Sequence, residues 1–190
     1  MIAIVDYGVG NLFSLQSSFE RIGAETVITS DVEILNAADK VLLPGVGAFR
    51  DAREKLARTG LDKVLIRLAH EGKKIMGICL GMQMLFDKSF EYGEYEGLGL
   101  LRGNVVGMQG TIPENLKIPH IGWNSLSLKA SHPIFKYTKE GDSFISFIPF
   151  TQRIATKACL PHRNMAERLP RLLQSETCAE HSSIPKRAER

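Results

Sequence analysis

The stretch Lys74-Ile75-Met76-Gly77-Ile78-Cys79-Leu80-Gly81-Met82-Gln83 decides the fold of this chain. It predicts a strand that ends at a cysteine and is followed by an apolar helix. Gly77 and Gly81 stand two residues on either side of Cys79, so the chain can turn sharply, as in a nucleophile elbow. Cys79 would then lie at the helix N-terminus, where free N–H groups and the helix dipole favour a thiolate over a thiol. A buried structural cysteine is the alternative.

Two further apolar strands run into glycine-rich loops. Val41–Phe49 contains Pro44-Gly45-Val46-Gly47, a turn whose backbone N–H groups can hold a developing oxyanion. The alternative is an ordinary turn between a strand and a helix, in which the glycines are needed only because they can adopt a positive φ. Ile2–Asn11 is a strand followed by Gly8-Val9-Gly10. Phe13 occupies the third glycine position of the dinucleotide-binding GxGxxG pattern, so nucleotide binding is unsupported.

Hydrophobic periodicity predicts an alternation of strands and helices before residue 90. The predicted strands are 2–6, 25–29, 40–43 and 74–78, and the predicted helices are 11–22, 31–37, 48–58, 61–71 and 80–87. An acidic, aromatic loop (90–96) and a strand near 103–108 follow. Alternating strands and helices predict an α/β fold with a mostly parallel sheet and helices on both faces. The active site then belongs at the carboxyl ends of the strands.

Composition is that of an ordinary globular protein, with 44% hydrophobic and 24% charged residues among 190. No run of about 18 apolar residues occurs, so we expect no membrane association and a cytoplasmic location. The net charge of +3 does not predict nucleic-acid binding, because the excess of basic residues lies in 151–190. Three cysteines, one of them in the elbow, argue against a disulfide framework.

Four motifs carry a resemblance to a known family. They are Asp6–Asn11, Pro44–Phe49, Gly77–Gln83 and Pro119-His120-Ile121-Gly122-Trp123-Asn124. Together they resemble the glutaminase subunits of imidazole glycerol phosphate synthase, which are class I glutamine amidotransferases. The cysteine elbow alone indicates only the wider class, whereas the first and last motifs point to the histidine-biosynthesis member. The resemblance runs from Met1 to about Asp142 and then stops.

The resemblance implies that Cys79 attacks the side-chain amide of glutamine and releases ammonia. The oxyanion would be held by backbone N–H groups of Leu80 and of the loop Gly45, Val46 and Gly47. Gln83 matches a position that contacts the substrate; a solvated helix residue is the alternative. We expect no cofactor and no metal site.

The resemblance also implies a partner, a (β/α)₈ barrel cyclase subunit that uses the ammonia to make imidazole glycerol phosphate. Asn11, Trp123 and Asn124 are the candidates for this interface. Trp123 is the only tryptophan in the chain, and burial as a core anchor would explain it equally well.

The last forty-odd residues do not fit the pattern before them. All seventeen glycines lie at or before Gly141, and no Val, Tyr or Asp follows Asp142. The ordinary interpretations are a disordered basic tail or an Arg-rich, partner-binding helix around Met165–Leu173. A third explanation is a change of reading frame near Ser143.

The frame hypothesis comes from back-translation, with each new codon read from the third base of one residue and the first two of the next. Ser143 to Thr151 then permits VYFIHSFY, Pro161 to Ala166 permits T-x-EYG, and His181 to Arg190 permits QFHPEKSGE. The family resemblance implies such sequences here, with the His and Glu of FHPE completing a Cys-His-Glu triad. One lost base near codon 143 would produce the tail as written.

We therefore predict an incomplete glutamine amidotransferase domain in 1–143 and an aberrant, out-of-frame or disordered tail in 144–190. None of the histidines present, at positions 70, 120, 132, 162 and 181, has an evident Glu partner. The first functional hypothesis is a glutaminase impaired as written. A catalytically dead copy that only docks on the cyclase is the alternative. Another cysteine hydrolase on this fold is less compatible with Gln83 and Pro44–Phe49.

Overall fold

The computed structural model describes residues 1–108, 120–126, 128, 135–148 and 150–153. The chain divides into two compact units, Met1–Gly107 and Met108–Arg190, and each is described by itself. The elements of the first unit are β1 (Ile2–Val5), α1 (Leu12–Glu20), β2 (Thr26–Thr29), α2 (Val32–Ala37), β3 (Lys40–Leu43), α3 (Phe49–Arg58), α4 (Leu61–His70), β4 (Lys74–Gly77), α5 (Leu80–Met84), β5 (Phe86–Ser89), β6 (Tyr95–Glu96) and β7 (Leu101–Gly107).

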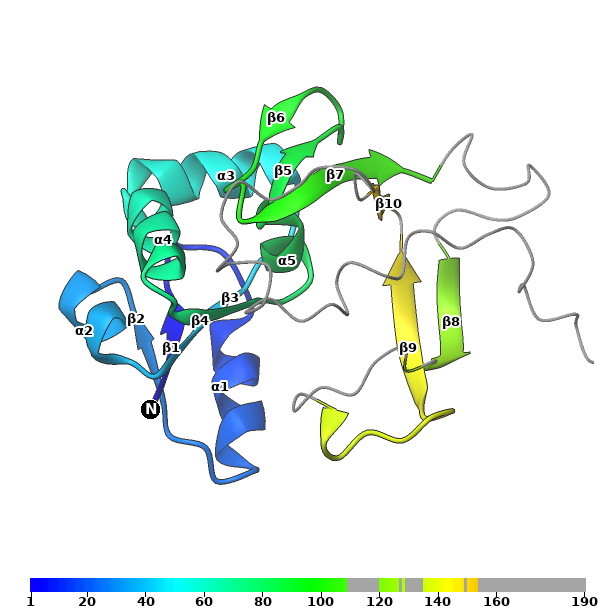
Figure 1. The fold of residues 1–190 in the computed structure, drawn as a ribbon, viewed down its shortest axis with the longest axis horizontal. Helices are drawn as coiled ribbons and strands as arrows, with labels where there is room; N and C mark the ends of the chain where they lie inside the picture. The colour runs from blue at the N-terminus through cyan, green and yellow to red at the C-terminus, as the bar shows by residue number, and fades with distance from the viewer. Residues whose placement is uncertain (109–119, 127, 129–134, 149, 154–190) are drawn as a thin grey trace, which may run out of the picture. The chain divides into compact units, whose positions relative to one another are not determined.

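A parallel sheet with the strand order β2-β1-β3-β4 is the centre of the first unit. Its two inner strands are fully apolar over Ala3–Val5 and Val41–Leu43, and these side chains are buried. The chain moves from β1 to β2 in one direction along the sheet and from β3 to β4 in the other. Because crossovers between parallel strands are right-handed, α1 lies on one face of the sheet, and α3 and α4 lie on the other. Figure 1 shows this arrangement. The predicted α/β fold with a mostly parallel sheet is confirmed.

The helix predicted over 80–87 is wrong in its second half. The helix α5 ends at Met84, and Phe86 begins the strand β5, which lies between β6 and β7. The backbone carbonyl groups of Phe86 and Asp87 accept hydrogen bonds from Gly99 and Gly97, and Phe86 lies opposite Leu101 on β7. Residues ten or more positions away thus hold this segment extended, which no local periodicity reveals.

The second unit contains β8 (His120–Ser125), β9 (Ser143–Ile148) and β10 (Phe150–Arg153). β8 and β9 pair in antiparallel register, with Trp123 opposite Ile145 and Ser125 opposite Ser143. The domain boundary predicted near residue 143 falls at the start of β9. The tail beyond residue 153 lies outside the described residues, so the prediction of an aberrant 144–190 stays a prediction.

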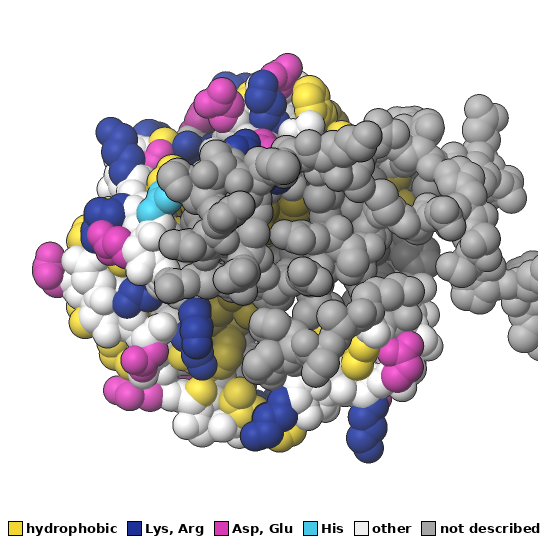
Figure 2. All heavy atoms as spheres, viewed as in Figure 1, with side chains coloured by type: hydrophobic (Ala, Val, Ile, Leu, Met, Phe, Trp, Pro, Cys, Tyr) yellow, Lys and Arg dark blue, Asp and Glu magenta, His cyan; other side chains and the backbone are white. Residues whose placement is uncertain are grey.

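Parts of the first unit leave apolar surface uncovered. No residue of α1 is buried, and Phe13 on this helix is 77% exposed. Among the described strands, β4 is at the edge of the parallel sheet, and Met76 on it is 48% exposed. Figure 2 shows hydrophobic side chains at the surface where α1 lies in Figure 1. An edge strand and a helix face of this kind are usually covered in a complete α/β domain.

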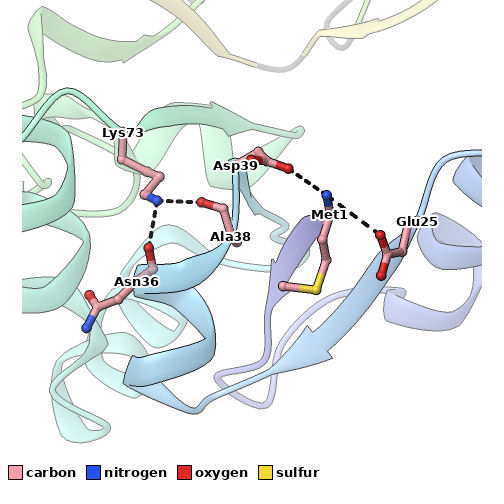
Figure 3. Close-up of polar contacts among 6 residues, drawn as sticks. All are labelled: Met1, Glu25, Asn36, Ala38, Asp39 and Lys73. Atoms are coloured by element: carbon pink, nitrogen blue, oxygen red, sulfur yellow. Dashed lines mark hydrogen bonds and ion pairs between the residues drawn. The ribbon is translucent and has the colours of Figure 1, made fainter.

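A polar cluster lies where the parallel strands begin (Figure 3). The α-amino group of Met1 donates a hydrogen bond to Asp39 at 2.6 Å, and Glu25 lies 3.9 Å away. Lys73 donates to the carbonyl oxygens of Asn36 at 2.8 Å and of Ala38, both at the end of α2. These contacts tie the start of β1 to the segments that lead into β2 and β3, and Lys73 ties the end of α2 to the segment before β4.

This cluster predicts a pH-dependent contribution to stability. The hydrogen bond between the Met1 α-amino group and the Asp39 carboxylate raises the pKa of the amino group and lowers the pKa of Asp39. The contribution of Asp39 is therefore present above its ordinary pKa of 3.8 and is lost as the pH falls through the lowered value. That of the amino group is present below 8.0 and is lost as the pH rises through the raised value.

We expect Asp39→Asn to lower the urea midpoint most between about pH 4 and pH 8. The difference from the unchanged chain should shrink on both sides of this window. Urea unfolding across the pH range measures it, and acetylation of the α-amino group is the matched control, because it should remove the alkaline decline. A midpoint difference that stays constant from acid to alkaline pH would contradict the assignment.

None of the helices in the described ranges is long and apolar enough to cross a membrane.

Candidate active site

Cys79 occupies a strained turn between β4 and α5. Its backbone has φ 55° and ψ −119°, and the only other non-glycine residue with positive φ in the described part of the chain is Tyr92. Its side chain is exposed and its thiol is free. Non-glycine residues in such conformations cluster at functional sites, because the surrounding structure must hold them there. The sharp turn predicted from the flanking glycines is present, and its cysteine is accessible.

The glycines on either side of Cys79 allow strand and helix to approach closely. A Cβ atom on Gly81 would overlap the carbonyl oxygen of Leu43, and one on Gly77 would overlap the backbone of Met82. Any side chain at these two positions would force the end of β3 or the start of α5 to move. The elbow therefore requires both glycines for close packing, while Cys79 itself adopts the positive φ of the turn.

The loop after β3 lies directly against the start of α5. A Cβ atom on Gly45 would be 2.5 Å from the backbone nitrogen of Gly81 and 2.9 Å from Cβ of Leu80. Val46 is 52% exposed, and Gly47 adopts φ +86° with open space around it. The structure thus brings Gly45 together with Leu80 at the turn that carries the cysteine, and Val46 and Gly47 follow Gly45 in the same loop.

These residues offer unused hydrogen-bond donors. No described residue accepts a hydrogen bond from the backbone N–H groups of Gly45, Val46, Gly47 or Leu80. Unpaired N–H groups beside a nucleophile are what stabilisation of a tetrahedral oxyanion requires. Chemically, this arrangement suits attack by a thiolate on a carbonyl or amide carbon.

Gln83 lies one turn along α5 from Cys79. Its side chain is half-buried, and its backbone N–H donates to the carbonyl oxygen of Cys79 at 3.3 Å. This position is compatible with the predicted contact to substrate.

Two contacts at this site were not foreseen from the sequence. The hydroxyl of Tyr7 donates to the carbonyl oxygen of Pro44 at 2.7 Å. The carboxylate of Glu91 accepts a hydrogen bond from the backbone N–H of Phe49, the first residue of α3, at 2.8 Å. A helix N-terminus favours a carboxylate, and Glu91 takes the place of a local cap because Ala48 has none. The two residues are 42 positions apart, and only the acidic character of the 90–96 loop hinted at this pairing.

The predicted partner residues lie on both units. Asn11 is exposed and caps α1, since its side-chain oxygen accepts from Ser14 N–H at 3.3 Å. Trp123 is 71% exposed, so it is not a core anchor within the described structure. Asn124, beside it on β8, is also exposed.

The described part of the chain supplies no evident histidine base for Cys79. His70 ends α4 just before β4 begins, which puts it at the amino edge of the sheet, opposite the carboxyl ends. His120 starts β8, but its side chain is not described, and His132, His162 and His181 lie outside the described residues. Within those same described residues, no group of three or more metal-binding side chains could hold a metal ion.

Comparison with known proteins agrees with this geometry. A family model of the CobB/CobQ-like glutamine amidotransferase domain matches residues 3–115. The imidazole glycerol phosphate synthase subunit HisH of Sulfurimonas denitrificans is 48% identical over 149 residues, which covers 78% of this chain and 71% of that protein. The same subunit of Caldanaerobacter subterraneus subsp. tengcongensis is 46% identical over 148 residues, which covers 78% and 70%.

A crystal structure of a glutamine amidotransferase superposes with a TM-score of 0.62, covering 82% of this chain and 76% of that one. Its sequence identity of 17% makes this a likeness of fold alone. The family match and the HisH relatives go further, because they cover most of the chain at high identity. Together with the cysteine elbow, they show that this chain belongs to the HisH family of glutamine amidotransferases.

Proposed function

We propose that this chain is a glutaminase subunit that hydrolyses glutamine to glutamate and ammonia, with Cys79 as the nucleophile. The observation that carries the proposal is the exposed Cys79 thiol in a left-handed turn, next to backbone N–H groups without a described acceptor. The HisH relatives support it, since they are subunits of imidazole glycerol phosphate synthase.

In the proposed reaction the sulfur of Cys79 forms a bond to the side-chain amide carbon of glutamine. The amide oxygen becomes an oxyanion, which accepts hydrogen bonds from Leu80 and from the Gly45–Gly47 loop. The C–N bond then breaks, and the nitrogen leaves as ammonia after gaining a proton. Water hydrolyses the resulting thioester to glutamate and frees the thiol. Gln83 orients the substrate from the next turn of α5.

The ammonia passes to a cyclase subunit, which uses it in histidine biosynthesis. Asn11, Trp123 and Asn124 form part of the surface that meets this partner, and the exposure of Trp123 supports that role. The cytoplasmic location stays a prediction from the sequence.

The FHPE sequence, which the resemblance implies for the His and Glu of the triad, does not occur in the chain as written. We propose that a lost base near codon 143 removed it by changing the reading frame. The stretch that matches the Sulfurimonas relative covers 78% of this chain and 71% of that protein. Part of each chain is therefore unaligned, as a change of reading frame would produce. A decayed copy that only binds the cyclase is the alternative. The nucleotide sequence across codon 143 distinguishes a clerical error from a real frameshift.

A glutamine-analogue diazo-ketone tests the nucleophile in the chain as written. We expect it to alkylate Cys79 even where turnover is lost, because labelling needs the bound substrate skeleton and the thiolate, not the full triad. Peptide mass spectrometry identifies the labelled residue, and excess glutamine should protect it. Labelling confined to Cys159 or Cys178 would refute the assignment.

A further inference from the structure

Tyr7 connects the end of β1 to the loop that carries the oxyanion residues. Its hydroxyl donates to the carbonyl oxygen of Pro44 at 2.7 Å, and the residue is only 3% exposed. Burial raises the pKa of Tyr7 well above its ordinary value, so the phenol keeps the proton that it donates. This hydrogen bond is therefore present at every pH at which the protein works.

Through the peptide group between Pro44 and Gly45, the contact with Tyr7 also determines the orientation of the Gly45 N–H. A peptide group is planar and, before a residue other than proline, trans, so its C=O and N–H point in opposite directions. Holding the Pro44 carbonyl on Tyr7 therefore fixes the direction of the Gly45 N–H. The loop around Gly10 supports the same residue, since a Cβ atom on Gly10 would lie 3.0 Å from Cβ of Pro44.

Gly45, the residue after this peptide bond, lies against the start of α5. Gly45 packs against Leu80 and Gly81, and its N–H has no acceptor among the described residues. The Pro44 carbonyl is thus held by the buried Tyr7 phenol, while Gly45, whose N–H has no described acceptor, lies beside the turn of Cys79. A rotation of this single peptide group would move the donor away without disturbing the sheet.

We propose that Tyr7 is a positioning residue for the oxyanion site, and that its hydroxyl holds the Pro44–Gly45 peptide group in the orientation that keeps the loop donors available to the substrate on Cys79. The inference rests on the proposed function. Tyr7 does not contact the reacting atoms in this scheme.

The test compares two reactions of Cys79 in the chain as written. The γ-(4-nitrophenyl) ester of glutamate acylates the thiolate: the S–C bond forms, the C–O bond breaks, and nitrophenolate leaves with the electron pair. This leaving group needs no proton, so the missing base does not prevent the step, but an oxyanion forms in its course. Iodoacetamide alkylates the same thiolate by displacing iodide, and no oxyanion develops.

We expect Tyr7→Phe to slow acylation about tenfold, the usual effect of one lost hydrogen bond, and to leave alkylation unchanged. Replacement of Tyr7 by 4-aminophenylalanine, which keeps a donor at the same place, should restore acylation. Tyr137→Phe is the matched control, because Tyr137 is 87% exposed, and both of its rates should be unchanged. If Tyr7→Phe does not fold, 4-methylphenylalanine, which fills the volume of tyrosine, replaces it in the comparison.

An unchanged ratio of acylation to alkylation would overturn the proposal. So would a parallel fall in both rates, because that result indicates a purely structural role. If the unchanged chain shows no acylation above that of Cys79→Ala, the proposed function itself fails, whatever the Tyr7 variants do.

Discussion

Restoring one base near codon 143 should raise the rate of glutamine hydrolysis by a factor of the order of 10²–10⁴ in the presence of the cyclase. The expected gain is that of a general base, because the restored frame returns the His of the FHPE sequence to deprotonate Cys79 and protonate ammonia. The unchanged chain has the elbow and the oxyanion loop but no such base in its described part. Release of glutamate from glutamine measures the rate.

Two variants control this experiment. Insertion of three bases at the same place lengthens the chain by one residue without changing the frame, and it should recover nothing. Alanine in place of the restored histidine should return the rate to that of the unchanged chain. Full glutamine turnover by the chain as written, together with a protease-resistant C-terminus through Arg190, would show that the tail is a genuine element.

The same restoration should increase stability. In the described part of the chain as written, β4 is an edge strand with Met76 exposed, and α1 buries no residue. Surfaces of this kind promote aggregation when they stay uncovered. We expect a sharper cooperative thermal transition and less aggregation after restoration, measured by calorimetry and light scattering.

Replacing Cys79 by Ala in the frame-restored protein should lower glutamine-dependent synthesis by a factor of about 10⁶, the effect of removing the nucleophile of a comparable hydrolase. Synthesis by the cyclase from added ammonia should be unchanged, since that reaction needs no glutaminase chemistry. The backbone strain at φ 55° is the same for alanine as for cysteine, because both carry a Cβ atom. The variant should therefore fold normally.

Cys79→Ser is the matched control, because it keeps a side chain of the same shape and replaces the thiol by a hydroxyl, a much weaker nucleophile. It should lose glutamine-dependent synthesis as Ala does. Loss of both the glutamine-dependent and the ammonia-dependent reactions in either variant would mean that Cys79 is a structural residue.

Prediction from sequence succeeded where local pattern and tertiary packing agree. The apolar runs of β1 and β3 and the amphipathic helices α3 and α4 lie within one or two residues of their predicted bounds. It failed after Met84, where an apolar segment read as helix is held as a strand by the chain near Leu98–Leu101. Hydrophobic periodicity is a property of one segment at a time, so it carries no information on hydrogen bonds to distant residues that override a local helix preference.

The sequence by itself determined the α/β class, the cysteine elbow and the glycine loop beside it, because glycine spacing and hydrophobic period are local properties of the chain. Only the tertiary structure decided that Gly45 packs on the start of α5, that Tyr7 holds the Pro44 carbonyl and that Glu91 caps α3. Each of these contacts joins residues more than thirty positions apart. Such pairs meet only when the parallel strands bring their carboxyl ends to one edge of the sheet, and no local pattern encodes which loops then touch.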